Sequence, residues 1–130
     1  MSKVPVISIV DDDKSVREAM QRLIRSLGYS TAAFASAEDY MLSDHLRDTS
    51  CLITDIKMPG MSGIEMQNWL IANGHRTPVI FVTALSEEKI RGRVLEAGAF
   101  GFFSKPPNKK CLIECIDRAL KGDASRSLEQ

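Results

Sequence analysis

A carboxylate near the middle of the chain follows an apolar segment and is the first candidate for chemistry. Asp55 comes directly after residues 51–54, which suit a buried strand, and the chain then turns because residues 59–63 hold a proline and two glycines. In an open parallel sheet, ligands usually bind in the crevice beyond the carboxyl ends of the strands. An aspartate that merely begins a turn would also fit this pattern, so Asp55 has to be weighed with its neighbours.

Polar groups also stand at the ends of the other predicted strands. A carboxylate pair, a hydroxyl group and an ammonium group occupy these positions: Asp11 and Asp12, Thr83, and Lys105. Each has an ordinary explanation alone, as a solvated helix start, a strand end or a surface charge. Together they are harder to explain that way, because the carboxyl ends of parallel strands share one edge of the sheet. We therefore expect all of them to meet Asp55 in one crevice.

Such a cluster has a specific chemistry. Two carboxylates about 4 Å apart repel by about 4 kcal/mol at an effective dielectric constant of about 20, so a proton or a cation must relieve them. Oxygen ligands without Cys or His favour a hard cation, Mg²⁺ or Mn²⁺, and Mg²⁺ prefers to share phosphate oxygens. The cluster thus predicts a phosphoryl site in which Asp55 attacks phosphorus. The metal and Lys105 would neutralise the equatorial oxygens, and Thr83 would donate its hydroxyl to one of them.

The hydrophobic pattern predicts the elements that position these residues. Strands are expected at residues 4–10, 31–34, 51–54, 78–83 and 100–104, and helices at residues 16–27, 36–41, 64–73, 86–95 and 109–120. We expect Asp12 or Asp13 to cap the first helix, a capping box at residues 36–39 to open the second, and Ser86 to cap the fourth. The alternation predicts an α/β fold: a flavodoxin-like five-stranded parallel sheet, order 2-1-3-4-5, with five helices on both faces.

Composition limits the classes of protein. The 130 residues, 44% of them hydrophobic, suffice for one domain with a real core, which we place at residues 1–122 with a tail or linker start at 123–130. Lys plus Arg and Asp plus Glu are both 17, and this zero net charge gives no indication of nucleic-acid binding. No apolar run approaches the roughly 20 residues of a membrane span, and the N-terminus lacks a signal-peptide core. Three cysteines without a CxxC pair fit the reducing cytoplasm.

Taken in order, the motifs resemble those of the receiver domains of two-component response regulators. The resemblance spans residues 4 to about 121 and rests on five segments: IVDDD at 9–13, DIKMPGMSG at 55–63, VTA at 82–84, AGA at 97–99, and Lys105-Pro106. Each segment is weak alone, but the ordered set is highly specific. The segments SVR at 15–17 and MPGMSG at 58–63 are similar in sequence to those of receivers that precede helix-turn-helix output domains.

The resemblance implies a metal site and a phosphoacceptor. Asp11 and Asp12 would be the acid pair that binds Mg²⁺ or Mn²⁺, with Asp12 as a direct ligand and Asp11 acting through water. Asp55 would be the phosphoacceptor and a metal ligand, and the backbone carbonyl of Lys57 would be a further ligand. Such a domain assists its own phosphorylation and dephosphorylation but is not an enzyme.

The resemblance also implies how the phosphorylated state is transmitted. Lys105 would contact the phosphoryl group, Thr83 would be the switch hydroxyl, and Phe102 would be the switch aromatic. Phe102 lacks the hydroxyl of the tyrosine often found there, so packing alone would drive its rotation. The bond between Lys105 and Pro106 is often cis in such domains. The face built by the fourth helix, fifth strand and fifth helix would carry the signal, often by forming a homodimer.

The partners implied are a cytoplasmic sensor histidine kinase and a second copy of the chain, with a DNA-binding output domain beyond this segment. This segment itself would contact neither membrane nor nucleic acid. The main alternative is a pseudo-receiver, an interaction module that never takes phosphate. The presence of the three aspartates, Thr83 and Lys105 argues against this alternative. A phosphatase-type hydrolase would want a second acid where Lys57 stands. A flavin-binding module would want a Ser/Thr/Gly-rich phosphate loop after the first strand.

Overall fold

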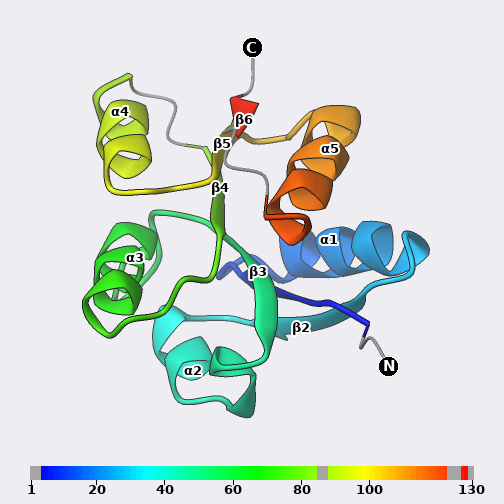
Figure 1. Ribbon diagram of the computed structural model, residues 1–130, viewed down its shortest axis with the longest axis horizontal. Helices are drawn as coiled ribbons and strands as arrows, with labels where there is room; N and C mark the ends of the chain where they lie inside the picture. Colours follow the sequence, from blue (N-terminus) through cyan, green and yellow to red (C-terminus); the bar gives the residue numbers. More distant parts are fainter. Residues whose placement is uncertain (1–3, 85–87, 123–126, 129–130) are drawn as a thin grey trace.

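A parallel β-sheet runs through the middle of the molecule, with helices on both faces (Figure 1). The structure is a computed structural model and describes residues 4–84, 88–122 and 127–128. The strand order is β2-β1-β3-β4-β5-β6, and every neighbouring pair is parallel. The strands are β1 (Val6–Val10), β2 (Ser30–Phe34), β3 (Thr49–Thr54), β4 (Val79–Thr83), β5 (Gly101–Ser104) and the two-residue β6 (Ser127–Leu128). The predicted order of five strands is confirmed, and β6 is an addition to it.

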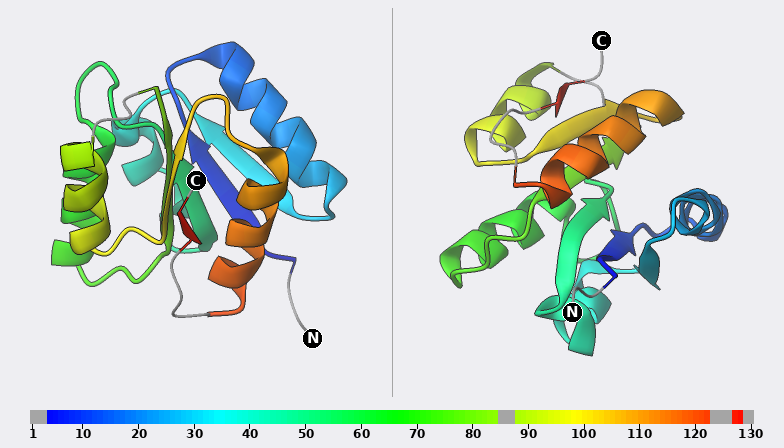
Figure 2. Two further views of the ribbon diagram at one scale, coloured as in Figure 1. Left: turned by 90° about the horizontal axis from the view of Figure 1, so that it is seen from above. Right: turned by 45° about the vertical axis from the view of Figure 1, so that its right-hand side comes forward.

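The helices form two layers (Figure 2), with α1 and α5 on one face of the sheet and α2, α3 and α4 on the other. They are α1 (Lys14–Ser26), α2 (Ala37–Met41), α3 (Gly63–Ala72), α4 (Glu88–Glu96) and α5 (Lys109–Leu120), with a short 3₁₀ turn at Asp44–Leu46. Among the described residues, no helix is long and apolar enough to span a bilayer.

Two hydrophobic cores result from the alternation of side chains along the strands. On β3, Cys51 and Ile53 pack with the α1–α5 layer, whereas Leu52 between them packs with the α2–α4 layer. Because both faces of the sheet are covered, the strands are nearly continuous apolar runs rather than alternating ones. This is why the strands were predictable from local composition.

Two helices, α1 and α2, begin with the side-chain caps that the sequence predicts. Asp13, rather than Asp12, caps α1, and its Oδ1 accepts hydrogen bonds from the backbone N–H groups of Ser15 and Val16. Ser36 caps α2 through the N–H of Asp39 at 3.1 Å, but α2 is only five residues long. The cap predicted at Ser86 lies outside the described residues.

The start of β3 differs from the prediction. The strand begins at Thr49, two residues earlier than the apolar run, because its hydroxyl lies 2.6 Å from the hydroxyl of Ser8 on β1. Both side chains are buried, and each satisfies the other inside the sheet. Polar residues in this position are not recognisable as strand residues from the sequence pattern alone.

Candidate functional site

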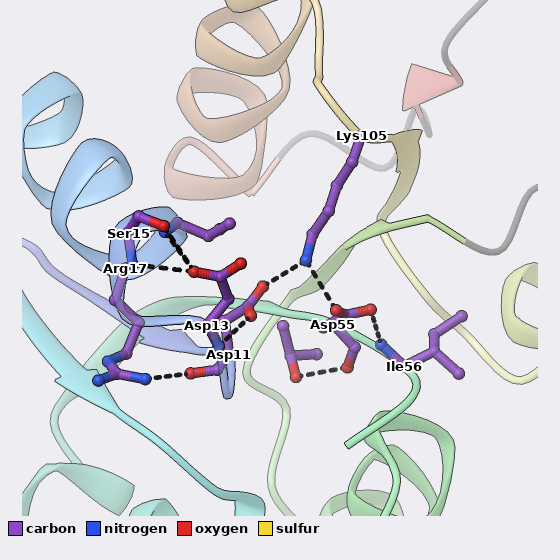
Figure 3. Close-up of polar contacts among 9 residues, drawn as sticks. Asp11, Asp13, Ser15, Arg17, Asp55, Ile56 and Lys105 are labelled. Atoms are coloured by element: carbon purple, nitrogen blue, oxygen red, sulfur yellow. Dashed lines mark hydrogen bonds and ion pairs between the residues drawn. The ribbon is translucent and has the colours of Figure 1, made fainter.

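Four strands end in or next to polar residues at one edge of the sheet, and Figure 3 shows three of these residues, Asp11, Asp55 and Lys105. Asp11 directly follows β1, Asp55 follows β3, Thr83 is the last residue of β4, and Lys105 follows β5. The ammonium group of Lys105 lies 2.8 Å from Asp11 Oδ2 and 2.8 Å from Asp55 Oδ2, so one cation bridges two carboxylates from different strands. The structure therefore brings Asp11, Asp55 and Lys105 together, as expected from their positions at the strand ends.

Backbone groups orient both carboxylates toward this cation. The N–H of Asp13 donates to Asp11 Oδ1 at 2.9 Å, and the N–H of Ile56 donates to Asp55 Oδ1 at 2.7 Å. In each aspartate one oxygen is thus held by the main chain while the other faces Lys105. Asp11 and Asp55 are buried, with 3% and 7% of their surface exposed, so few waters compete for these contacts.

Asp55 also has its main chain fixed on both sides. Its N–H donates to the carbonyl of Val10 on β1, and the loop that follows returns so that Gly63 N–H donates to the carbonyl of Ile56 at 2.8 Å. A Cβ atom on Gly63 would lie 2.1 Å from the carbonyl oxygen of Asp55. The sequence predicts a turn here but not this close contact, which depends on the path of the loop.

Three carboxylates form a set that suits a hard cation. Asp11, Asp12 and Asp55 each offer an oxygen atom, and these atoms all lie within 4.8 Å of one another. Asp11 and Asp55 are buried, whereas Asp12 is exposed, so the set opens to solvent on one side. An all-oxygen set with an open side matches the preference of Mg²⁺, which keeps several of its waters.

Burial and pairing act in opposite directions on the charges of the site. Burial raises the pKa of Asp11, although the hydrogen bonds from Lys105 and from the Asp13 N–H oppose this effect. Burial alone would lower the pKa of Lys105, but its contacts with Asp11 and Asp55 outweigh burial and raise it. The lysine is therefore a firmly charged cation beside Asp11, whose carboxyl group is harder to ionise than usual because its pKa is raised by burial.

The other predicted site residues lie around this pocket. Lys57 is exposed on the loop between β3 and α3. Thr83 is buried, and its carbonyl accepts a hydrogen bond from the N–H of Lys105 at 2.9 Å. Phe102 is also buried and pairs across the strands with Phe81, two residues before Thr83. Thr83 and Phe102 therefore point to the same face of the sheet, the one covered by α2, α3 and α4. The bond between Lys105 and Pro106 is cis.

One contact at the site has no distinct signal in the sequence. The guanidinium group of Arg17, in the first turn of α1, donates to the carbonyl of Asp11 at 2.7 Å (Figure 3). This hydrogen bond fixes the backbone between the two neighbouring aspartates. An arginine near an acidic loop is such a common pattern that this hydrogen bond could not be predicted from the sequence.

A groove opens beside the pocket, between α1 and the loop that leads from β5 to α5. Its volume is about 700 Å³, and its lining is mainly apolar. Lys105 lies at its edge, and the apolar lining includes Val16, Met20, Leu23, Pro106, Pro107 and Leu112. A protein that docks here would lie directly beside the two buried carboxylates.

Comparisons with known proteins match most of this chain. A family model described as "Response regulator receiver domain" matches residues 7–117. The response regulator protein TodT of Pseudomonas putida is 37% identical over 119 residues, which are 92% of this chain and 52% of TodT. The chain thus spans about half the length of such curated relatives.

Solved structures agree in fold and in sequence. The response regulator StyR superposes with a TM-score of 0.85 at 36% identity, covering 94% of this chain and 62% of that one. A response regulator receiver protein from Pseudoalteromonas atlantica superposes with a TM-score of 0.84 at 28% identity, covering 91% and 98%. Family model, relatives and structures agree with the predicted resemblance: the chain belongs to the response regulator receiver family and is the receiver domain of a two-component response regulator.

Proposed function

We propose that Asp55 accepts a phosphoryl group from a histidine kinase in a reaction that needs Mg²⁺ or Mn²⁺. The observation that carries this proposal is the bridge that Lys105 makes between the buried carboxylates of Asp11 and Asp55. A half-buried cation beside a buried nucleophile is already in place for the negative charge that a phosphoryl group brings. The domain is an acceptor rather than an enzyme, as is general for its family.

Asp55 is oriented for attack before the donor arrives. Its Oδ1 is held by the Ile56 N–H, and its Oδ2 lies 2.8 Å from the ammonium group of Lys105. In the transfer, a carboxylate oxygen forms a bond to phosphorus while the P–N bond of the phosphohistidine breaks, and its electron pair stays on the imidazole. Lys105 then contacts a phosphoryl oxygen. A bound Mg²⁺ would neutralise charge on the phosphoryl oxygens.

The residues that would hold the metal are assigned from the resemblance to receiver domains, and the cluster of three carboxylates supports the assignment. Asp12 is the exposed member of the set and is assigned as a direct ligand, with Asp55 as the second and Asp11 acting through water. The carbonyl of Lys57, on the loop after Asp55, completes the protein ligands. The Lys57 side chain is exposed and carries no part of this assignment.

The groove between α1 and the β5–α5 loop is the surface assigned to the kinase. A donor imidazole can reach Asp55 only if its protein docks beside the pocket, and Lys105 lies both in the pocket and at the edge of the groove. Its apolar lining provides the area that such docking must bury.

The reaction is placed in the cytoplasm, in keeping with three free cysteines.

Phosphorylation by a small donor tests the proposal directly. Incubation with Mg²⁺ and acetyl phosphate is expected to add one phosphoryl group, detected by intact mass as an acid-stable and base-labile adduct. Chelation of the metal should abolish the adduct. A chain that stays unmodified would instead be a pseudo-receiver, and one that releases phosphate continuously without accumulating the adduct would be a hydrolase.

Thr83 and Phe102 are proposed to couple phosphorylation to dimerisation. They point to the same face of the sheet, so movement of the Thr83 hydroxyl toward the phosphoryl group would vacate space near Phe102. Thr83→Ala is expected to accept the phosphoryl group but to remain as monomeric as the unphosphorylated parent, measured by light scattering. Ser104→Ala, which changes the hydroxyl residue paired with Thr83 on β5, is the control. Dimerisation of Thr83→Ala like the parent would contradict this coupling.

An output domain is proposed beyond this segment. The chain spans about half of TodT, and relatives such as DctR of Rhodobacter capsulatus are named transcriptional regulatory proteins. We therefore expect the remaining part of a longer protein to bind DNA, with this domain controlling it. Nucleic-acid contacts would then belong to that part and not to residues 1–122.

A further inference from the structure

Glu38 on α2 contacts the loop between β3 and α3, although 23 residues separate it from its partner. Its Oε2 accepts a hydrogen bond from the backbone N–H of Met61 at 2.9 Å. A bond from a main-chain donor to a charged carboxylate is about twice as strong as one between neutral groups. The bond also lowers the pKa of Glu38, so the carboxylate stays ionised at neutral pH.

The neighbouring glycine makes room for this contact. Gly60 has φ +78°, a conformation that side-chain-bearing residues rarely adopt. A Cβ atom built on Gly60 would lie 2.6 Å from Glu38 Oε2. The loop therefore comes close to Glu38 through a glycine and a donated N–H, and two adjacent residues are shaped to accept this one carboxylate.

The hydrogen bond between Glu38 and Met61 restrains the loop that also carries Lys57. The two ends of the loop are bonded to each other, because Gly63 N–H donates to the carbonyl of Ile56. Its middle, residues 57–61, includes Lys57, whose carbonyl is assigned to the metal. Glu38 joins this middle part to α2, a separate helix. A restraint at Met61 thus limits how far the Lys57 carbonyl can move.

We propose that Glu38 is a positioning residue that sets the affinity of the site for Mg²⁺ by holding the loop that carries Lys57. The inference rests on the proposed function, because it assumes that the aspartates and the Lys57 carbonyl bind the metal. Glu38 touches neither metal nor phosphoryl group in this scheme. By holding the loop, Glu38 reduces the number of loop conformations in which the Lys57 carbonyl lies away from the metal.

The test is a Mg²⁺ titration of the full chain, followed residue by residue in ¹H–¹⁵N spectra. Glu38→Ala is expected to weaken Mg²⁺ binding about three- to tenfold, which is less than the loss on removing a direct support of a metal ligand. Its Met61 amide should exchange with solvent faster than in the parent. Glu38→Gln keeps an oxygen acceptor of similar reach and should bind Mg²⁺ within about twofold of the parent.

Asp39→Ala is the matched control, because it removes the neighbouring exposed carboxylate on the same helix. It should bind Mg²⁺ like the parent. If Glu38→Ala lowers the thermal midpoint but keeps the parental Mg²⁺ affinity, Glu38 is only structural and the proposal is wrong. It is also wrong if Glu38→Gln binds as weakly as Glu38→Ala. A parent that binds no Mg²⁺ would overturn the proposed function as well, whereas a phosphorylated parent with an unaffected Glu38→Ala overturns this inference alone.

Discussion

Asp55→Asn is expected to abolish the phosphoryl adduct while leaving the protein folded. The amide has no carboxylate to form an acyl phosphate, yet its oxygen can still accept the hydrogen bond from the Ile56 N–H. The substitution removes one of three carboxylates that repel one another, so the free energy of unfolding should stay within about 1 kcal/mol of the parent. Intact mass after incubation with Mg²⁺ and acetyl phosphate measures the first effect, and urea unfolding measures the second.

Asp39→Asn serves as the control for this variant, because it changes an exposed carboxylate on α2 that is not one of the three carboxylates of the pocket. It should accumulate the adduct like the parent. An adduct at parental level in Asp55→Asn would mean that another side chain accepts the phosphoryl group. Peptide mapping of that adduct would then test Asp11, the other buried carboxylate in contact with Lys105.

Gly63→Ala is expected to cause the largest loss of stability among single substitutions at the site. The new Cβ would lie 2.1 Å from the carbonyl oxygen of Asp55 and 3.1 Å from the ring of Phe81. Main-chain atoms cannot yield as a flexible side chain can, so we expect the free energy of unfolding to fall by about 3 kcal/mol or more. Because Asp55 itself must shift, adduct formation with acetyl phosphate should fall as well.

A second glycine provides the control for this effect. Gly92 lies within α4, and a Cβ atom there would meet nothing within 4 Å. Gly92→Ala should be neutral or stabilising by up to about 1 kcal/mol, because alanine favours helix more than glycine does. Equal unfolding free energies for Gly63→Ala and the parent would contradict the close contact between the start of α3 and Asp55.

The sequence predicts the fold well wherever its signals are local. The helix α5 has its predicted bounds, because Asn108 caps it and its apolar residues recur on one face. The start of β3 at Thr49 was missed because it depends on a hydroxyl partner in another strand. The start of α3 lies at Gly63, one residue before its predicted position, but its capping box, formed by Ser62 and Glu65, was missed because it lies within a turn-rich segment.

At the site, too, some contacts could be predicted from the sequence and others could not. Asp11, Asp55 and Lys105 were predictable as neighbours, because the order of the strands alone brings their ends to one edge of the sheet. The contacts of Arg17 and Glu38 were not, because they depend on where a loop passes a helix. Strand topology thus fixes which reactive groups meet, whereas the conformations of the loops fix how firmly each is held.

The alternation along β4 places two adjacent residues in different layers of the molecule. Val82 lines the groove assigned to the kinase, and the next residue, Thr83, points to the opposite layer with Phe102. In the proposed scheme, the choice of phosphodonor and the downstream response therefore rest on separate sets of side chains, on opposite faces of one strand. We expect substitutions in the groove to change the preferred kinase without changing the response to phosphorylation.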